Sequence, residues 1–307
     1  MQTVLISGGT GFTGKHLTKI LLQKGYRVIV LSRDAHSREP VSNMRYAHWD
    51  ISKQEIDKTA ISDADHIIHL AGAGVMDRRW SKKYMAEIAD SRTRSASLLV
   101  NSLKTTTHKV QSFISASAIG WYGADTNSTA FTEEAPASPG FLGETCRVWE
   151  AAADEATTLG IRVCKLRTGI VLGKGGGAFE KYSKPVKYGL VPIMSSGKQV
   201  MSWIHLDDIC RMYLFGIENN QLQGNFNAVA TVPESNRSFM LKLAKQMRGN
   251  RFIAFHIPAF ALKLGLGKSS IEILKSCTVS NSKIKAAGFT FIYPTAEAAL
   301  AELCRPL

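Results

Sequence analysis

Residues 3–14 read Thr3-Val4-Leu5-Ile6-Ser7-Gly8-Gly9-Thr10-Gly11-Phe12-Thr13-Gly14. A short apolar strand pattern runs into glycines spaced G-x-x-G-x-x-G, and a helical pattern follows over 14–25. In such a unit, Gly8 permits a tight turn, Gly11 permits close approach of a pyrophosphate, and Gly14 permits close helix packing. Amides at the helix start then face the phosphates, aided by the helix dipole. The stretch predicts a dinucleotide site whose contacts come from Gly8, Thr10, Gly11, Phe12, Thr13 and Gly14.

Working outward, short apolar runs alternate with helix-length amphipathic segments. This alternation predicts a parallel sheet covered by helices on both faces, which is the doubly wound (Rossmann) α/β class. The expected strands are 3–7, 27–32, 44–49, 66–70, 112–115, 163–167 and 225–230, and the clearest expected helices are 14–25, 82–103 and 149–160. The rhythm weakens after Gly173, and residues 174–200 suggest a long loop with one short helix. We therefore expect a dinucleotide-binding domain over 1–230 and a small, mainly helical substrate-side lobe over 231–307.

The end of the second strand bears on which dinucleotide is bound. An NAD site usually places a carboxylate there, on the ribose 2′-hydroxyl. Here the strand ends at Ser32-Arg33, and a guanidinium pairs well with the 2′-phosphate of NADP. Arg38 is a second candidate cation, whereas Asp34 would restore an acid if the register shifted by one residue. The expected cofactor is NADP.

Two further strand ends are candidates for cofactor contacts. Asp50 follows the third strand, where it either accepts a hydrogen bond from the adenine amino group or caps the next helix. The fourth strand closes with His69-Leu70-Ala71-Gly72, whose small residues let backbone pass close to the cofactor.

Composition excludes several classes of protein. The 307 residues carry a net charge of +13, but no run of five or more like charges occurs, so nucleic acid is not an expected partner. Five cysteines without a CxxC pair argue against a disulfide framework and against a zinc site, and no metal is expected. No secretory signal and no 18-residue apolar stretch is present, so a cytoplasmic protein without a membrane partner is expected.

Several separated segments together resemble the extended short-chain dehydrogenases/reductases, and among them the YfcH-like, NAD-dependent epimerase/dehydratase type of epimerase family. The resemblance spans nearly the whole chain and rests on segments in the family's order: 8–14, 69–72, 78–80, 91–92, 115–123, 141–150, 167–173, 201–208, Asn227 and 288–291. It implies a nicotinamide cofactor and a Ser91 near the nicotinamide, where relatives place an Asn. The alternative for Ser91 is a purely structural role in its helix.

The usual proton relay of this superfamily is missing from the chain. Classical members use Tyr-x-x-x-Lys one helical turn apart, with the Lys lowering the pKa of the Tyr. If Glu150 matches the family's helix glutamate, Leu142 stands at the Tyr position and Cys146 at the Lys position. No Tyr in the chain has a Lys four residues later. Hydride transfer by the usual relay is therefore in doubt.

Three residues are candidates for the missing chemistry. Ser117, or its neighbour Ser115, follows the fifth strand where relatives place a substrate-polarising hydroxyl; the alternative is capping of the strand end. Tyr122 either lines the pocket or packs as an amphipathic wall residue. Glu144 is a possible acid–base group on the helix that faces the cofactor, although charged helix residues are mostly solvated.

The segment His205-Leu206-Asp207-Asp208 invites a metal or triad interpretation, but the spacing alone is weak, and a blander role is a helix cap by Asp207 or Asp208. The loop Gly175-Gly176-Gly177 lacks the context of a phosphate cradle.

Two functions remain open on the sequence alone. One is an NADP-dependent oxidoreductase or epimerase acting on a small polar or nucleotide-linked substrate. The other is an NADP-binding sensor or scaffold without turnover, which the missing relay favours. Relatives pair through the helices corresponding to 82–103 and 141–160, so a homodimer is expected to be possible.

Overall fold

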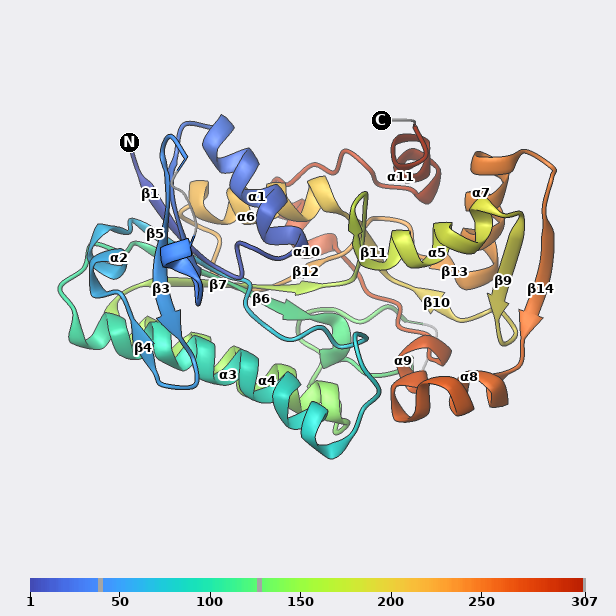
Figure 1. The fold of residues 1–307 in the computed structure, drawn as a ribbon, viewed down its shortest axis with the longest axis horizontal. Helices are drawn as coiled ribbons and strands as arrows, with labels where there is room; N and C mark the ends of the chain where they lie inside the picture. The colour runs from blue at the N-terminus through green and yellow to red at the C-terminus, as the bar shows by residue number, and fades with distance from the viewer. Residues whose placement is uncertain (38–40, 126–128, 306–307) are drawn as a thin grey trace.

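The computed structural model describes residues 1–37, 41–125 and 129–305. Its centre is an eight-stranded sheet in the order β12-β7-β6-β5-β1-β2-β3-β4 (Figure 1). Every pair in it is parallel except β3–β4. The strands are β1 (Thr3–Ser7), β2 (Arg27–Ser32), β3 (Met44–Asp50), β4 (Glu55–Ile56), β5 (His66–His69), β6 (Ser112–Ala118), β7 (Arg162–Thr168) and β12 (Gly224–Ala228). The predicted doubly wound class is confirmed.

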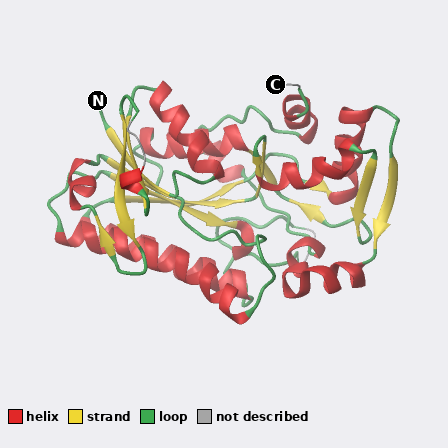
Figure 2. Cartoon of the chain, in the orientation of Figure 1, coloured by secondary structure: helices red, strands yellow, loops and turns green. Residues whose placement is uncertain are grey.

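Helices cover both faces of this sheet, as Figures 1 and 2 show. One face carries α1 (Phe12–Gln23) and α6 (Leu206–Glu218), and the other carries α2 (Lys58–Asp63), α3 (Lys82–Thr105) and α4 (Phe141–Asp154). The predicted helix over 14–25 begins two residues earlier, and the one predicted over 149–160 begins at Phe141 and ends in a 3-10 turn over Glu155–Leu159. The start of α4 agrees with the helix over 141–160 that the family resemblance implies, and the difference at α1 lies within the ordinary scatter of helix ends.

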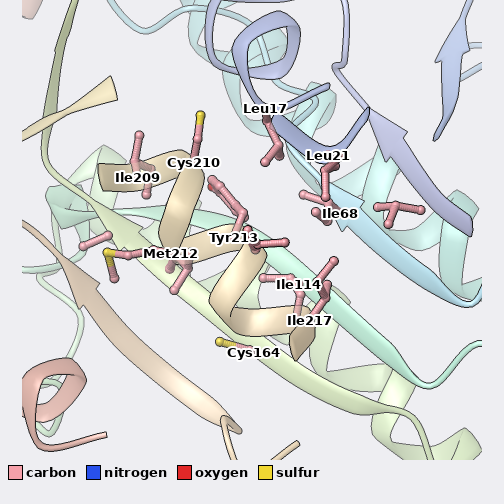
Figure 3. Close-up of a cluster of buried hydrophobic side chains, with 14 of the residues drawn as sticks. Leu17, Leu21, Ile68, Ile114, Cys164, Ile209, Cys210, Met212, Tyr213 and Ile217 are labelled. Atoms are coloured by element: carbon pink, nitrogen blue, oxygen red, sulfur yellow. The ribbon is translucent and has the colours of Figure 1, made fainter. Parts of the chain in front are cut away.

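The largest apolar core lies between the sheet and the pair α1–α6 (Figure 3). Leu17 and Leu21 of α1 meet Ile209 and Tyr213 of α6 above strand residues such as Ile68, and all five are almost fully buried. The strands read as near-continuous apolar runs because both of their faces are covered. This core fixes the start of α1 against the sheet, and therefore fixes the glycine turn that precedes it.

A smaller lobe lies at one end of the long axis (Figure 1). Its helices are α5 (Gly177–Lys187), α7 (Asn236–Arg248), α8 (Ala259–Leu266), α9 (Ser270–Leu274) and α11 (Ala296–Leu303), whereas α10 (Ser282–Ala286) packs beside β12 of the sheet domain. Short strand pairs connect them: β8 (Ile170–Gly173) with β11 (Trp203–His205), β9 (Leu190–Met194) with β14 (Ile253–Ile257), and β10 (Val200–Met201) with β13 (Glu234–Ser235).

The expected boundary at residue 230 does not divide this lobe from the sheet domain. Residues 174–200, expected as a long loop with one short helix, supply α5 and also the strand β9. Both pack with α7, and β9 pairs with β14. In return, Ile284 and Phe289 from the tail are buried in the core of the sheet domain. Sequence periodicity misses this exchange because β9 pairs with a strand about sixty residues away, and such pairing leaves no local signal.

Candidate dinucleotide site

The glycine turn has the shape that a phosphate cradle requires. Gly8 has a left-handed φ of +74°, and a Cβ there would lie 2.8 Å from the carbonyl carbon of Leu70. A Cβ on Gly14 would lie 2.2 Å from the Gly8 oxygen, so the helix closes onto the turn itself. Gly11 is the N-cap of α1 and offers no side-chain cap, so amides of Phe12 and the next residues remain for an anion. The turn thus fits a dinucleotide pyrophosphate.

This turn lies at the topological switch point of the sheet. Going outward from β1, the chain continues to β2 on one side and, later, to β5 on the other. Ligands of open α/β sheets bind in the crevice outside the carboxyl ends of strands at such a point. The Ser7 Oγ accepts a 3.4 Å hydrogen bond from the Ala71 amide, which joins the ends of β1 and β5. The predicted segments 8–14 and 69–72 are therefore brought together.

Arg33 stands directly after β2, and its side chain is exposed. Ser32 beside it is buried, and its Oγ accepts a 3.2 Å hydrogen bond from the Asp34 amide. The strand ends at Ser32 as predicted, so no shift of register brings Asp34 to its last position. Arg38, the second candidate cation, lies outside the described residues.

Asp50 ends β3, but it does not cap a helix. Its Oδ1 accepts hydrogen bonds from the Ser52 amide at 2.8 Å and the Ser52 Oγ at 2.6 Å, and these lower the pKa of the carboxyl. The next helix, α2, is capped by Asp57 instead, through a bond from the Thr59 amide. The capping alternative is thus wrong in detail: Asp50 closes the turn between β3 and β4. A contact with adenine stays a prediction.

The side chain of His69 is fully buried between β5 and the helices α3 and α4. The Trp149 indole N–H lies 3.3 Å from His69 Nδ1, and His69 Nε2 lies 2.8 Å from the Ser95 Oγ. Burial lowers the pKa of this imidazole to about 3, so it stays neutral. Any cofactor contact at His69 is therefore confined to its backbone, and the side chain ties β5 to α3 and α4.

Ser91 holds the loop that follows β5. Its Oγ accepts a 2.9 Å hydrogen bond from the Ala73 amide and donates to the Ile88 carbonyl. This arrangement places Ser91 beside the predicted segment 69–72, with its hydroxyl engaged by the loop. The structural alternative for this residue is therefore observed, and a contact with the cofactor stays a prediction.

Phe12 has a role that its position in the turn does not reveal. A Cβ on Gly173, Gly176 or Gly177 would lie between 2.6 and 2.9 Å from the Phe12 ring. The glycine loop dismissed as a phosphate cradle thus packs over the first residue of α1. Only the tertiary structure identifies it as the cover of the glycine turn, because β8 and α1 are distant in sequence.

The helix α4 confirms where the usual relay is missing. A Cβ on Gly120, after β6, would lie 3.1 Å from the Leu142 Cβ and 3.8 Å from the Cys146 Sγ. Leu142 and Cys146 therefore share the face turned toward the end of β6, one helical turn apart. Cys146 is buried, and burial raises the pKa of its thiol to about 11. Neither side chain can transfer a proton near neutral pH.

Arg92, part of the family-like segment 91–92 but not predicted as a site residue, supplies a cation close by. Its guanidinium lies 5.2 Å from the Trp149 ring centroid, and a Cβ on Gly72 would lie 3.1 Å from its Cζ. Burial lowers the pKa of Arg92, with Cys146 among the groups that oppose this shift. Among the described residues, no carboxylate forms an ion pair with Arg92; its Nη1 donates to the Ile88 carbonyl at 2.9 Å. A half-buried cation that pairs with no carboxylate of the described residues therefore lies beside Gly72 and the Trp149 ring.

Ser117 belongs to a buried ionic network. Its Oγ donates a 2.6 Å hydrogen bond to Glu150, which forms a two-point ion pair with Arg167 at 2.8 and 2.9 Å. Ser115, the alternative by one residue, lies beside His69 at 3.3 Å. Both hydroxyls are thus engaged within the protein; the Ser117 hydroxyl binds a carboxylate rather than the backbone at the strand end, and its catalytic role stays a prediction.

Tyr122 is part of the same network. Its hydroxyl donates to Asn227 at 2.6 Å and accepts from Arg167 at 3.0 Å, and its ring stacks on Phe131. Burial raises the pKa of Tyr122 to about 12. The residue is 4% exposed, so the packing alternative describes it better than a pocket wall.

Glu144 lies on the surface. Its carboxylate pairs with Arg147 at 2.6 Å, and the side chain is 56% exposed. The hydrogen bond from Arg147 lowers the pKa of Glu144. The solvated alternative is therefore observed, and α4 turns Leu142 and Cys146 to the site in its place.

Comparison with known proteins decides the family. Residues 4–229 match the model of the NAD dependent epimerase/dehydratase family. The chain belongs to this family. Residues 257–303 match a second model, a domain of unknown function (DUF1731). An epimerase family protein of Staphylococcus saprophyticus is 34% identical over 305 residues and covers 99% of both chains. The epimerase family protein YfhF of Bacillus subtilis is 31% identical over 302 residues and covers 98% of both.

Solved structures agree with this membership. The human epimerase family protein SDR39U1 (isoform 2), crystallised with NADPH, has a TM-score of 0.86 at 26% identity, with both chains covered completely. UDP-glucose 4-epimerase of Thermotoga maritima has a TM-score of 0.79 at 22% identity, covering 99% and 97%, which shows a shared fold. The resemblance to extended short-chain dehydrogenases/reductases is confirmed, and the chain is a nicotinamide-dinucleotide-dependent, epimerase-like member of that superfamily.

In this epimerase family member, the side chains of His205, Asp207 and Asp208 are engaged by other groups of the protein. His205 itself caps α6, because its Nδ1 accepts the Asp207 amide at 3.1 Å. Asp208 is fully buried and accepts the amides of Ile292 and Tyr293, both at 2.9 Å. The cap expected from Asp207 or Asp208 is thus corrected to His205. Within the described residues, no group of His, Cys, Asp and Glu has metal-binding geometry.

Proposed function

We propose that this epimerase family member is an NADP-dependent oxidoreductase or epimerase acting on a small polar or nucleotide-linked substrate. The observation that carries the proposal is the open glycine turn at the switch point, with the exposed Arg33 directly after β2. A guanidinium at this position favours the 2′-phosphate of NADP over the 2′-hydroxyl of NAD. The human relative crystallised with NADPH supports the choice.

Different residues of the chain contact different parts of this cofactor. Amides at the start of α1 bind the pyrophosphate, and Ser32 with Arg33 binds the 2′-phosphate. Asp50, at the end of the next strand, accepts a hydrogen bond from the adenine amino group. The backbone over 69–72 and Ser91 are placed beside the nicotinamide. Gly173 and Gly176 pack on Phe12 and so limit access of water to the turn.

Bound NADP supplies or accepts a hydride at the substrate carbon. The substrate oxygen then gains or loses negative charge, and in classical relatives a Tyr–Lys pair compensates for it. Here Arg92 is a cation that interacts electrostatically with Cys146, the residue at the position of the missing Lys. We assign to it the stabilisation of charge on that oxygen, while solvent supplies the proton in the reduction and accepts it in the oxidation. A half-buried cation is effective in this role because its field is less screened than that of a fully exposed one.

A second function is favoured by the face formed by Leu142 and Cys146. An apolar face at the relay position suits an NADP-binding sensor or scaffold that performs no turnover. In that case Arg92 orders the nicotinamide half without catalysis.

The dimer expected through α3 and α4 also stays a proposal. The large exposed apolar side chains of the described residues all lie outside these two helices.

The decisive experiment is a fluorescence titration of purified protein with NADPH and with NADH, for the wild type and for Arg33→Ala. We expect NADPH to bind at least about tenfold more tightly, a difference of roughly 1.4 kcal/mol, and Arg33→Ala to abolish the preference. Arg27→Ala is the matched control, because Arg27 is also exposed but lies at the other end of β2. Equal binding of the two cofactors, unchanged in Arg33→Ala, would exclude the assigned 2′-phosphate contact.

Turnover separates the two functions. NADPH-loaded protein is screened against carbonyl substrates and nucleotide sugars, with wild type and Arg92→Gln compared on every hit. Oxidation of NADPH that Arg92→Gln slows supports the enzyme, whereas tight binding with no oxidation across the screen supports the sensor.

The structure also bears on location in one respect: among the helices of the described residues, none has the length and apolar character needed to cross a bilayer.

A further inference from the structure

The net charge of this protein is concentrated at one end of the molecule. Residues 181–206 and 235–271 together contain 11 Lys and Arg and no Asp or Glu. The other 244 residues contain 27 basic and 25 acidic residues and are therefore close to neutral. We call these two segments the basic end. Strand pairing joins them, with β9 against β14 and β10 against β13.

The cations of the basic end face solvent. Ten of the eleven are exposed, and only Lys242 is held in a bridge, to Glu234 and Glu297. No carboxylate of the described residues pairs with the other ten. These charges therefore project a positive potential from the end of the long axis that carries β14 and α8 (Figure 1).

Exposed apolar side chains collect on the same end. Of the eleven large apolar side chains exposed in the described residues, seven belong to it: Tyr188, Leu190, Ile253, Phe255, Phe260, Leu264 and Ile271. Leu190 and Ile253 are register partners, and Phe255 follows on the same face of the strand pair. Phe260 and Leu264 are one turn apart on α8 and are 73% and 77% exposed. Apolar surface concentrated in this way marks an interaction site.

We propose that the basic end docks onto an anionic lipid surface. Apolar side chains inserted at the headgroup boundary, together with surrounding cations, are the two signals that stable peripheral binding needs. A second copy of this chain is a poor occupant, because two surfaces with eleven cations each repel one another. Nucleic acid is also a poorer fit, since only three of the seven exposed apolar side chains have rings that could stack on bases. The other four, Leu190, Ile253, Leu264 and Ile271, neither stack on bases nor form hydrogen bonds.

This inference is independent of the cofactor assignment. It also reverses the expectation of no membrane partner, which rested on the lack of a spanning segment; surface docking requires none. The geometry places the docking end at the far end of the molecule from β3 and β4, as Figure 1 shows.

The test is co-sedimentation of the full chain with vesicles. Vesicles of phosphatidylcholine alone are compared with vesicles that also contain phosphatidylglycerol, at low and high KCl. We expect at least about a hundredfold stronger partitioning onto the anionic vesicles, lost at high salt. Arg251→Gln/Lys263→Gln/Lys268→Gln should weaken partitioning by about fivefold per cation, or roughly a hundredfold together. The control Lys19→Gln/Lys24→Gln/Lys53→Gln removes three exposed lysines elsewhere and should change partitioning less than about twofold.

A second variant tests insertion apart from charge. Phe260→Ser/Leu264→Ser keeps every cation and should still lower partitioning about tenfold, because binding scales with inserted apolar area. Thermal unfolding and circular dichroism verify that each variant is folded without reference to any cofactor. Three results would overturn the proposal: equal binding to neutral vesicles, no vesicle binding with tight salt-sensitive binding to RNA, or no vesicle binding with a dimer that Phe260→Ser/Leu264→Ser dissociates.

Discussion

The guanidinium of Arg167 and the carboxylate of Glu150 form a two-point ion pair at 2.8 and 2.9 Å, with side chains only 1% and 4% exposed. Arg167 also lies 3.7 Å from the Trp121 ring centroid and donates to Tyr122. This pair joins α4 to β7 below the end of β6. It organises the region where the superfamily performs its chemistry.

Removing one partner of this pair should destabilise the fold strongly. Glu150→Ala leaves the Arg167 charge buried and unpaired, at a cost of roughly 3–5 kcal/mol in the free energy of unfolding. The measurement is urea unfolding of the wild type and variant. Glu150→Leu/Arg167→Met, which removes both charges, should lose less, and Glu144→Gln on the surface pair should leave the unfolding midpoint unchanged. A single variant as stable as wild type would contradict this account.

The glycines of the turn should separate stability from cofactor affinity. Gly14→Ala places a Cβ 2.2 Å from the Gly8 oxygen and should cost about 1–3 kcal/mol of stability. Gly11→Ala, at φ −77° and exposed, should fold normally but weaken NADPH binding, because its methyl group occupies the approach to the amides. Thermal unfolding and NADPH titration of both variants give the comparison. If Gly11→Ala binds NADPH as wild type does, the pyrophosphate is not placed at this turn.

Arg92 should act on the nicotinamide half of the cofactor alone. Arg92→Gln removes the cation beside Gly72 and should weaken NADPH binding by several-fold, while leaving 2′,5′-ADP, which lacks nicotinamide, unaffected. Arg92→Lys should recover part of the loss because it restores the charge. An equal loss for NADPH and 2′,5′-ADP would instead indicate a general structural defect.

The buried His69 should make stability dependent on pH. The pKa of His69 is about 3 in the folded chain and 6.5 ordinarily. Below pH 6.5 the His69 imidazole therefore binds a proton in the unfolded chain but stays neutral in the folded chain. Stability is therefore complete above pH 6.5 and falls as the pH is lowered, with a slope approaching 1.4 kcal/mol per pH unit. Urea unfolding across a pH series should show a shallower slope for His69→Gln. The exposed His256→Gln is the control and should leave the slope unchanged.

Local sequence patterns predict the cofactor turn and most strands of the central sheet. Both β1 and β2 have the bounds that their apolar runs predict, and the glycine spacing over 8–14 requires the turn that is observed. These features are local, because a buried parallel strand and a strand–turn–helix unit each carry their signal in consecutive residues. The missing relay at Leu142 and Cys146 is equally a property of spacing along one helix.

Long-range packing sets which polar groups remain available to a ligand. Ser117, Tyr122 and His69 have suitable chemistry in sequence, yet partners far along the chain engage their side chains. Arg92 is not predicted as a site residue, and it becomes a candidate because packing half-buries it beside Gly72 with no carboxylate of the described residues paired to it. The sequence likewise does not predict that residues 174–200 pack in the small lobe while Ile284 and Phe289 pack in the sheet domain. Periodicity records which face of an element is buried, but the identity of its partner depends on long-range packing that no local pattern encodes.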